Sequence, residues 1–141
     1  MNRGRTWLVA IALTLAPLSV SADDVSGATK ILCAATEATV CTFDGECEIG
    51  APWQWNIPSF VVIDLDAKTI STTGSAPEKR RSEFSRVERD EEHVVLQGYE
   101  NGRAFSFVIH LPTGEMTAAV ARDGVAVSAF GMCTDHEAGD D

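Results

Sequence analysis

The chain has 141 residues, and its 21 acidic and 11 basic residues give it a formal net charge of −10 at neutral pH. Such an acidic protein repels nucleic acid, so nucleic-acid binding is excluded as its function. Hydrophobic residues make up 45% of the chain, enough to form the core of one small domain.

The first 22 residues have the three parts of a secretory signal peptide. Arg3 and Arg5 form a basic start, and an apolar run extends from Trp7 to Leu18 before small residues that end at Ala22. The run is shorter than the ~20 apolar residues that a helix needs to cross a bilayer. We therefore expect cleavage after Ala22, no stable membrane insertion afterwards, and a periplasmic or secreted protein.

Four cysteines follow the expected cleavage site, and an even number of cysteines in an exported chain is typical of disulfides. They are Cys33, Cys41, Cys47 and Cys133. Structural zinc sites usually contain close Cys-x-x-Cys pairs, and the chain has no such pair. We therefore predict two disulfides, no metal site and no cofactor.

The pairing of these cysteines depends on a turn at Asp44-Gly45. A three-residue loop with its glycine in the left-handed conformation places Cys41 opposite Cys47, at a separation suited to a disulfide. A two-residue loop shifts the register and places Thr42 opposite Cys47. The cysteines favour the first register, which leaves the first and last cysteines to pair with each other.

The elements of the first half follow from weaker patterns. Ser26 can cap a short N-terminal helix, whose apolar face would hold Ala28, Ile31, Leu32 and Ala35. The segment from Ala51 to Ser59 is expected to cross in extended form. Further strands are expected over residues 60–65, 69–73 and 84–89, with a polar loop over 74–82.

The second half predicts a four-strand meander from about Glu92 to Cys133. Its turns are Asn101-Gly102, Thr113-Gly114 and Asp123-Gly124. The first turn sets Leu96 opposite Phe107, the second sets Leu111 opposite Met116, and the third sets Val120 opposite Val127. All three turns keep the apolar side chains on one face of the sheet.

The fold class predicted is therefore mainly β, with a short N-terminal helix and two disulfides. An up-and-down antiparallel meander of this size usually closes into a small barrel, and a sandwich is the alternative. We assign residues 1–22 to the signal peptide, 23–133 to a single β-domain and 134–141 to an acidic, disordered tail.

Three side chains are candidates for binding. Trp53 and Trp55 would point the same way on an extended chain, either as an aromatic platform for a sugar or a partner, or as rim packing. His110 lies on the strand face opposite Phe107 and Ile109, where it is either a binding residue or an ordinary exposed histidine. No convergent set of catalytic residues is found.

One short segment is strongly basic. Lys79, Arg80 and Arg81 follow one another in the expected polar loop, beside Glu78 and Glu83. We expect these cations to form ion pairs with the neighbouring carboxylates.

The turn glycines, core positions and cysteines resemble those of an uncharacterised family of small exported proteobacterial proteins. The matching residues are Leu32-Cys33-Ala34, Cys41, Gly45-x-Cys47, Pro58-x-Phe60, Ile63-Asp64, Ala67-Lys68, Leu96-Gln97-Gly98, Gly102-Arg103, Thr113-Gly114-x-Met116, Asp123-Gly124 and Phe130-Gly131-x-Cys133. The two tryptophans lie outside this pattern. The resemblance implies a fold and no catalytic residues.

Three functions follow as hypotheses. The first is a non-catalytic periplasmic binding or envelope-associated protein whose negative charge engages a basic partner, such as a lysozyme-like enzyme. The second is a carrier of a small apolar ligand inside the barrel. The third is a small hydrolase-like enzyme, with His110 and Asp64 as its candidate residues. The sequence predicts no particular oligomeric state.

Overall fold

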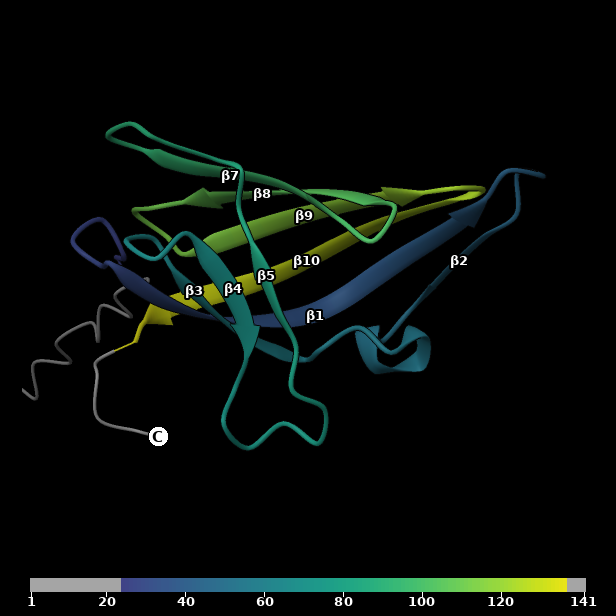
Figure 1. Cartoon of the computed structure of the whole chain (residues 1–141), viewed down its shortest axis with the longest axis horizontal. Coiled ribbons are helices and arrows are strands. Elements are labelled where there is room, and N and C mark those ends of the chain that lie inside the picture. Colours follow the sequence, from purple (N-terminus) through teal and green to yellow (C-terminus); the bar gives the residue numbers. More distant parts are fainter. Residues whose placement is uncertain (1–23, 137–141) are drawn as a thin grey trace, which may run out of the picture.

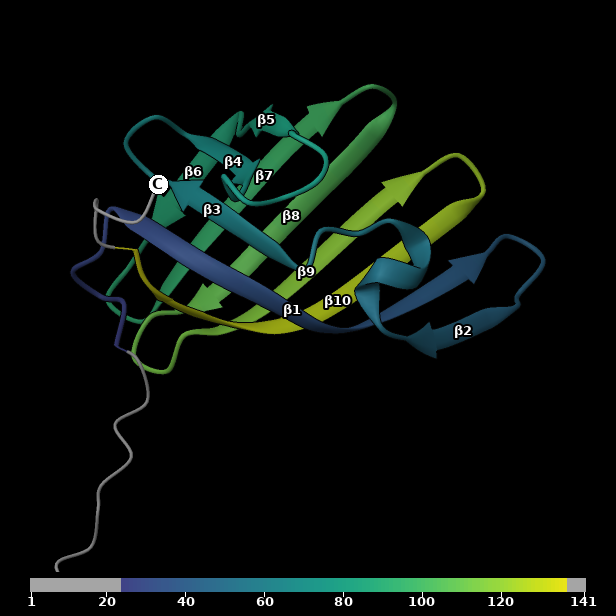
Figure 2. The same ribbon diagram turned by 90° about the horizontal axis from the view of Figure 1, so that it is seen from below.

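The computed structural model describes residues 24–136, and in that range the chain forms one antiparallel sheet with a single turn of 3-10 helix. The strands run in the order β5-β4-β3-β1-β10-β9-β8-β7-β6, with β2 beside β1 (Figures 1 and 2). The elements are β1 (Lys30–Thr42), β2 (Cys47–Gly50), η1 (Pro52–Trp55), β3 (Phe60–Asp64), β4 (Thr69–Thr72), β5 (Arg81–Glu83), β6 (Arg86–Arg89), β7 (His93–Glu100), β8 (Arg103–His110), β9 (Glu115–Arg122) and β10 (Val125–Asp135).

The predicted N-terminal helix is wrong, because the residues assigned to it belong largely to β1. This strand pairs with β10 along its length, with β3 over its first half and with β2 over its second half. Ile31 and Cys33 are fully buried while Lys30 is exposed, which is the two-residue period of a strand. A helix here would remove the backbone hydrogen bonds on both sides of β1.

The sheet is an antiparallel half-barrel, and the closed barrel predicted from the turns is not confirmed. Its two edge strands, β5 and β6, are joined by Phe84 and Ser85, whose amides donate to the carbonyls of Lys68 in the β3–β4 turn and Gln97 on β7. The chain thus crosses from one edge of the sheet to the other at one point along the strands, through Phe84 and Ser85. β5 pairs with β4 alone, so no ladder closes the barrel beyond that crossing.

The hydrophobic core lies at the end of the half-barrel that this crossing covers. The N-terminal segment also covers this end: Val25 is buried and donates its amide to the Leu111 carbonyl at 2.9 Å. Phe84 packs edge-on against Phe105 and Phe107. The largest fully buried side chains are Ile31, Ile63, Leu96, Ile109, Leu111, Val25 and Val94.

Both predicted disulfides are confirmed. Cys33 and Cys133 are direct partners across β1 and β10, and their Cα atoms are 4.0 Å apart in the core. Cys41 and Cys47 are partners across β1 and β2, with Cα atoms 4.1 Å apart. The hairpin loop is Phe43-Asp44-Gly45, closed by the Thr42 amide, which donates to the Glu46 carbonyl at 2.9 Å, and Gly45 has a φ of 92°. Two disulfides indicate an oxidising, non-cytoplasmic location. In the described range, no helix is long and apolar enough to cross a membrane.

The predicted meander is present, with one change of register. Leu96 faces Phe107 and Val120 faces Val127, as expected. Between β8 and β9, however, Met116 faces Ile109 rather than Leu111. Leu111 instead begins the turn and is buried in the core. The shift is two residues, so the apolar side chains remain on one face.

The ends of the domain differ slightly from the assigned boundaries. β10 continues to Asp135, two residues beyond Cys133, and the amide of His136 donates to the Lys30 carbonyl. The assigned signal peptide and residues 137–141 of the assigned tail lie outside the described residues.

Candidate functional site

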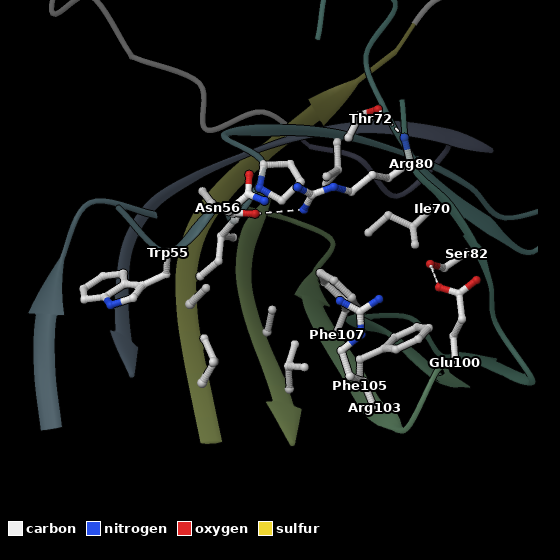
Figure 3. Close-up of a pocket in the computed structure, with 18 of the residues that line it drawn as sticks. Trp55, Asn56, Ile70, Thr72, Arg80, Ser82, Glu100, Arg103, Phe105 and Phe107 are labelled. Carbon is white, nitrogen blue, oxygen red and sulfur yellow. Dashed lines mark hydrogen bonds between the residues drawn. The ribbon is translucent and has the colours of Figure 1, made fainter. Parts of the chain in front are cut away.

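A pocket of about 640 Å³ occupies the concave face of the half-barrel, beside the crossing and on the side away from Val25 and Leu111 (Figure 3). Its floor is formed by β1, β10, β9 and β8, and its walls by the η1 segment on one side and by β4 and β5 on the other. Phe105 and Phe107 lie together on the β8 side of the floor, and Trp55 lies on the opposite side of the pocket.

The floor of the pocket is built from rows of side chains that face one another across the strands. The outer apolar row is Phe105, Val120, Val127 and Val40. The inner row is Phe107, Ala118, Ala129 and Ala38. Three neighbouring strands thus carry alanine at the same level, and their small side chains leave the concave face hollow.

The η1 turn provides one wall of the pocket. The prediction that residues 51–59 form an extended segment is therefore wrong. Pro52 begins the turn, and Asn56 ends it with a φ of 56°. A Cβ at Gly50 would lie 2.1 Å from Gln54 Oε1 and 3.0 Å from the Trp55 ring, so a larger residue there would displace the Gln54 side chain from this close approach. The turn brings Trp55 against the alanine cluster of the inner row.

The same turn separates the two tryptophans that the sequence predicted to act together. Trp55 is half-buried and lines the pocket, whereas Trp53 is 70% exposed and does not. An extended segment would place residues two apart on the same side, and a 3-10 turn does not.

Most of the basic residues in the described range line the pocket, although the protein is acidic. Five of the nine basic residues in the described range line the pocket, and Glu100 is the one acidic residue among its lining. The five are Lys79, Arg80, Arg81, Arg103 and Arg122. Glu100 accepts a hydrogen bond from Ser82 (Figure 3).

Two of these cations are engaged within the β4–β5 loop. Arg80 pairs with Glu78, and this hydrogen bond lowers the pKa of Glu78 below the usual value of 4.5. Arg80 also donates to the Asn56 carbonyl at 2.8 Å, which ties the loop to the η1 segment (Figure 3). Lys79 donates to the Thr73 carbonyl at 3.2 Å. Pairing with Glu78 matches part of the sequence expectation.

The other three arginines, Arg81, Arg103 and Arg122, form no ion pair with another described residue. Ala104 on β8 faces Ala121 on β9, and continuing this register by one residue places Arg103 opposite Arg122. Both side chains line the pocket, so they form the row that lies just outside Phe105 and Val120.

His110 and Asp64 are not brought together. His110 pairs across the strands with His93, their ring centroids 5.3 Å apart, and its Nδ1 lies 2.8 Å from the Thr113 hydroxyl. Asp64 pairs with Lys30 at 3.7 Å and accepts the Ala67 amide. Three strands separate β3 from β8 on the sheet path, and neither residue lines the pocket. Among residues 24–136 no group of three or more side chains could hold a metal ion.

No family model matches the chain, and neither the curated proteins nor the solved structures contain a match. The resemblance to a family of small exported proteins therefore stays a prediction, and the pocket has to be interpreted from its own chemistry.

Proposed function

We propose that this protein binds a small, largely apolar ligand on the concave face of its half-barrel. The observation that carries the proposal is the pocket of about 640 Å³, whose floor is made of valine, alanine and phenylalanine side chains. Ligand pockets typically measure about 300–1,000 Å³ and are mostly apolar with a few polar groups. The two disulfides fit such a role in the periplasm or outside the cell.

The exposure of the floor supports binding rather than simple packing. Phe105, Phe107 and Val120 are only partly buried, although they lie on the strand of the fully buried Ile109 or on the strand next to it. Val127, one strand further along the sheet, is also only partly buried. Apolar area left in water costs about 25 cal/mol per Å². A ligand that covers this floor would recover that free energy.

A neutral fluorescent probe, N-phenyl-1-naphthylamine, tests the proposal. We expect its emission to rise and shift to shorter wavelength when it is mixed with the protein. Val127→Trp places a large side chain in the pocket and should abolish this change. Ala126→Trp is the matched control, because Ala126 is the preceding residue of the same strand and is exposed outside the pocket.

Three results would contradict the proposal. They are no change in probe emission with the unmodified protein, an undiminished change with Val127→Trp, or an equal loss with both variants. Thermal unfolding of each variant, followed by circular dichroism, separates loss of the pocket from loss of the fold.

A second candidate function is engagement of a basic partner by the outer surface. Outside the pocket lining, the described residues include 16 of the 17 acidic side chains and only four of the nine basic ones. Clustering of the cations at the pocket thus leaves the remaining surface strongly negative, and such a surface steers cationic partners. Retention of basic proteins from a periplasmic extract at low salt, lost at high salt, tests this. Failure to retain any basic protein would refute it.

A further inference from the structure

We infer that the ligand is an amphiphile with an anionic head, and that Arg103 and Arg122 bind this head while its apolar chain lies on the floor of the pocket. This inference rests on the proposed function, because it assigns the polar end of a ligand whose apolar end the pocket holds. A carboxylate or a phosphate monoester on an alkyl chain has the required chemistry.

The first support is the contrast between the pocket and the rest of the molecule. The chain carries a net charge of −10, yet the lining of the pocket contains five cations and one carboxylate. The local field at the lip therefore attracts anions, although the protein as a whole repels them.

The second support is the position of Arg103 opposite Arg122. Like charges directly opposite each other on neighbouring strands destabilise a sheet, and Glu100, the partner of Arg103 on β7, offsets this for only one of the two arginines. Neither guanidinium has a carboxylate partner within 4.0 Å among the described residues. An anion between them would replace this repulsion with charge-assisted hydrogen bonds, and the fork of a guanidinium matches a carboxylate or phosphate.

The third support is the order of the rows along the strands. The arginine row lies at the lip, the Phe105–Val120 row follows, and the Phe107–Ala118 row and Met116 lie farther in. Figure 3 shows Arg103 on the same side of the pocket as Phe105 and Phe107. A ligand that entered with its alkyl chain first would leave its head beside the two arginines, without burying a charge.

The experiment compares ligands that share a chain and differ in their heads. Decanoate, decyl phosphate, decan-1-ol and decyltrimethylammonium are each titrated against the bound neutral probe, at about pH 8, where the carboxylate is ionised. We expect decanoate or decyl phosphate to bind about tenfold more tightly than decan-1-ol, and the cation to bind most weakly. Which of the two anions binds more tightly identifies the head.

The matched variants remove the same number of charges from two places. Arg103→Gln/Arg122→Gln should weaken binding of the anion about tenfold, to the level of the alcohol, and leave the alcohol unchanged. Lys68→Gln/Arg86→Gln changes the net charge equally but lies outside the pocket lining, and it should leave both affinities unchanged. Salt at about 0.5 M should reduce the preference of the unmodified protein for the anion.

The outcomes separate the two claims. Binding of the probe and the alcohol without preference for an anion overturns the inference and leaves the proposed function standing. A preference that survives Arg103→Gln/Arg122→Gln also overturns the inference alone. No binding of the probe or of any decyl compound overturns both.

Discussion

The two ends of the half-barrel are built on the same strands and have opposite characters. At the covered end Val94, Leu96 and Ile109 are fully buried. At the open end Phe105 and Val120 face the same side of the sheet but remain partly exposed. The difference comes from what covers each end and not from the strands themselves.

Two segments cover the closed end, the N-terminal residues around Val25 and the crossing at Phe84. At the open end, η1 with its neighbouring residues forms one wall, and Trp55 reaches only the alanine cluster. The same alternation of apolar and polar side chains along a strand thus forms the core at one end and the pocket floor at the other. We therefore expect stability to depend mainly on the closed end and ligand binding mainly on the open end.

The largest effect is expected from the disulfide of the closed end. The Cys33–Cys133 bond joins residues 100 apart in the sequence, and the Cys41–Cys47 bond joins residues six apart. A cross-link restricts the unfolded chain more when its loop is longer, so the double alanine variants should lose about 4 to 5 and about 2 kcal/mol respectively. Urea unfolding of both measures this difference. Equal losses would contradict the entropic argument.

The next effect compares the same substitution at the two ends. Val94→Ala removes two methyl groups from a fully buried site and should lower the free energy of unfolding by about 2 to 3 kcal/mol. Val120→Ala makes the same change at a half-exposed site in the pocket and should cost less than about 1 kcal/mol. It should weaken binding of the neutral probe, which Val94→Ala should not. A larger loss of stability at Val120 would break the proposed division.

Local sequence signals predicted the meander because each turn contains glycine and the strands alternate strictly. They failed where a long-range partner decides the structure. The apolar spacing of Ala28, Ile31 and Leu32 suits a helix as well as a strand, and pairing with β3 and β10 decides for the strand. The crossing at Phe84 and Ser85 likewise depends on the β3–β4 turn and β7, which are separate in the sequence.

The candidate site was harder to predict for a related reason. In the predicted register of β8 and β9, Arg122 faces Phe105. In the observed register it faces Arg103. The two-residue difference preserved the apolar face but changed which charged residues meet at its edge. A sequence pattern that identifies the face of a strand is therefore insufficient to identify a polar site on it.

A smaller effect should separate the two tryptophans. Trp55→Ala removes a half-buried ring from the alanine cluster and should cost about 1 to 2 kcal/mol and weaken binding of the neutral probe. Trp53→Ala changes a ring that is 70% exposed and should alter neither property measurably. Urea unfolding and probe titration of both variants test this. Equal effects would restore the predicted aromatic pair.

The smallest effect concerns a turn at the closed end and depends on pH. The Asp90 carboxylate accepts the amides of Glu92 and His93, at 2.8 and 2.7 Å, and these hydrogen bonds lower its pKa below the usual 3.8. A carboxyl group with a lower pKa in the folded state stabilises the protein above the unfolded value, and this contribution is lost as the pH falls through the folded value.

Asp90→Asn keeps the shape of the side chain and removes its titration. The unmodified protein should therefore be more stable than Asp90→Asn near neutral pH, and the difference should shrink as the pH falls below 3.8. Urea unfolding of both proteins over this pH range measures the difference in their free energies of unfolding. The other carboxylates contribute equally to both proteins, so they do not affect this difference. A difference that stayed constant with pH would show that the charge of the Asp90 carboxylate does not stabilise this turn. The closed end of the half-barrel would then be held by packing alone.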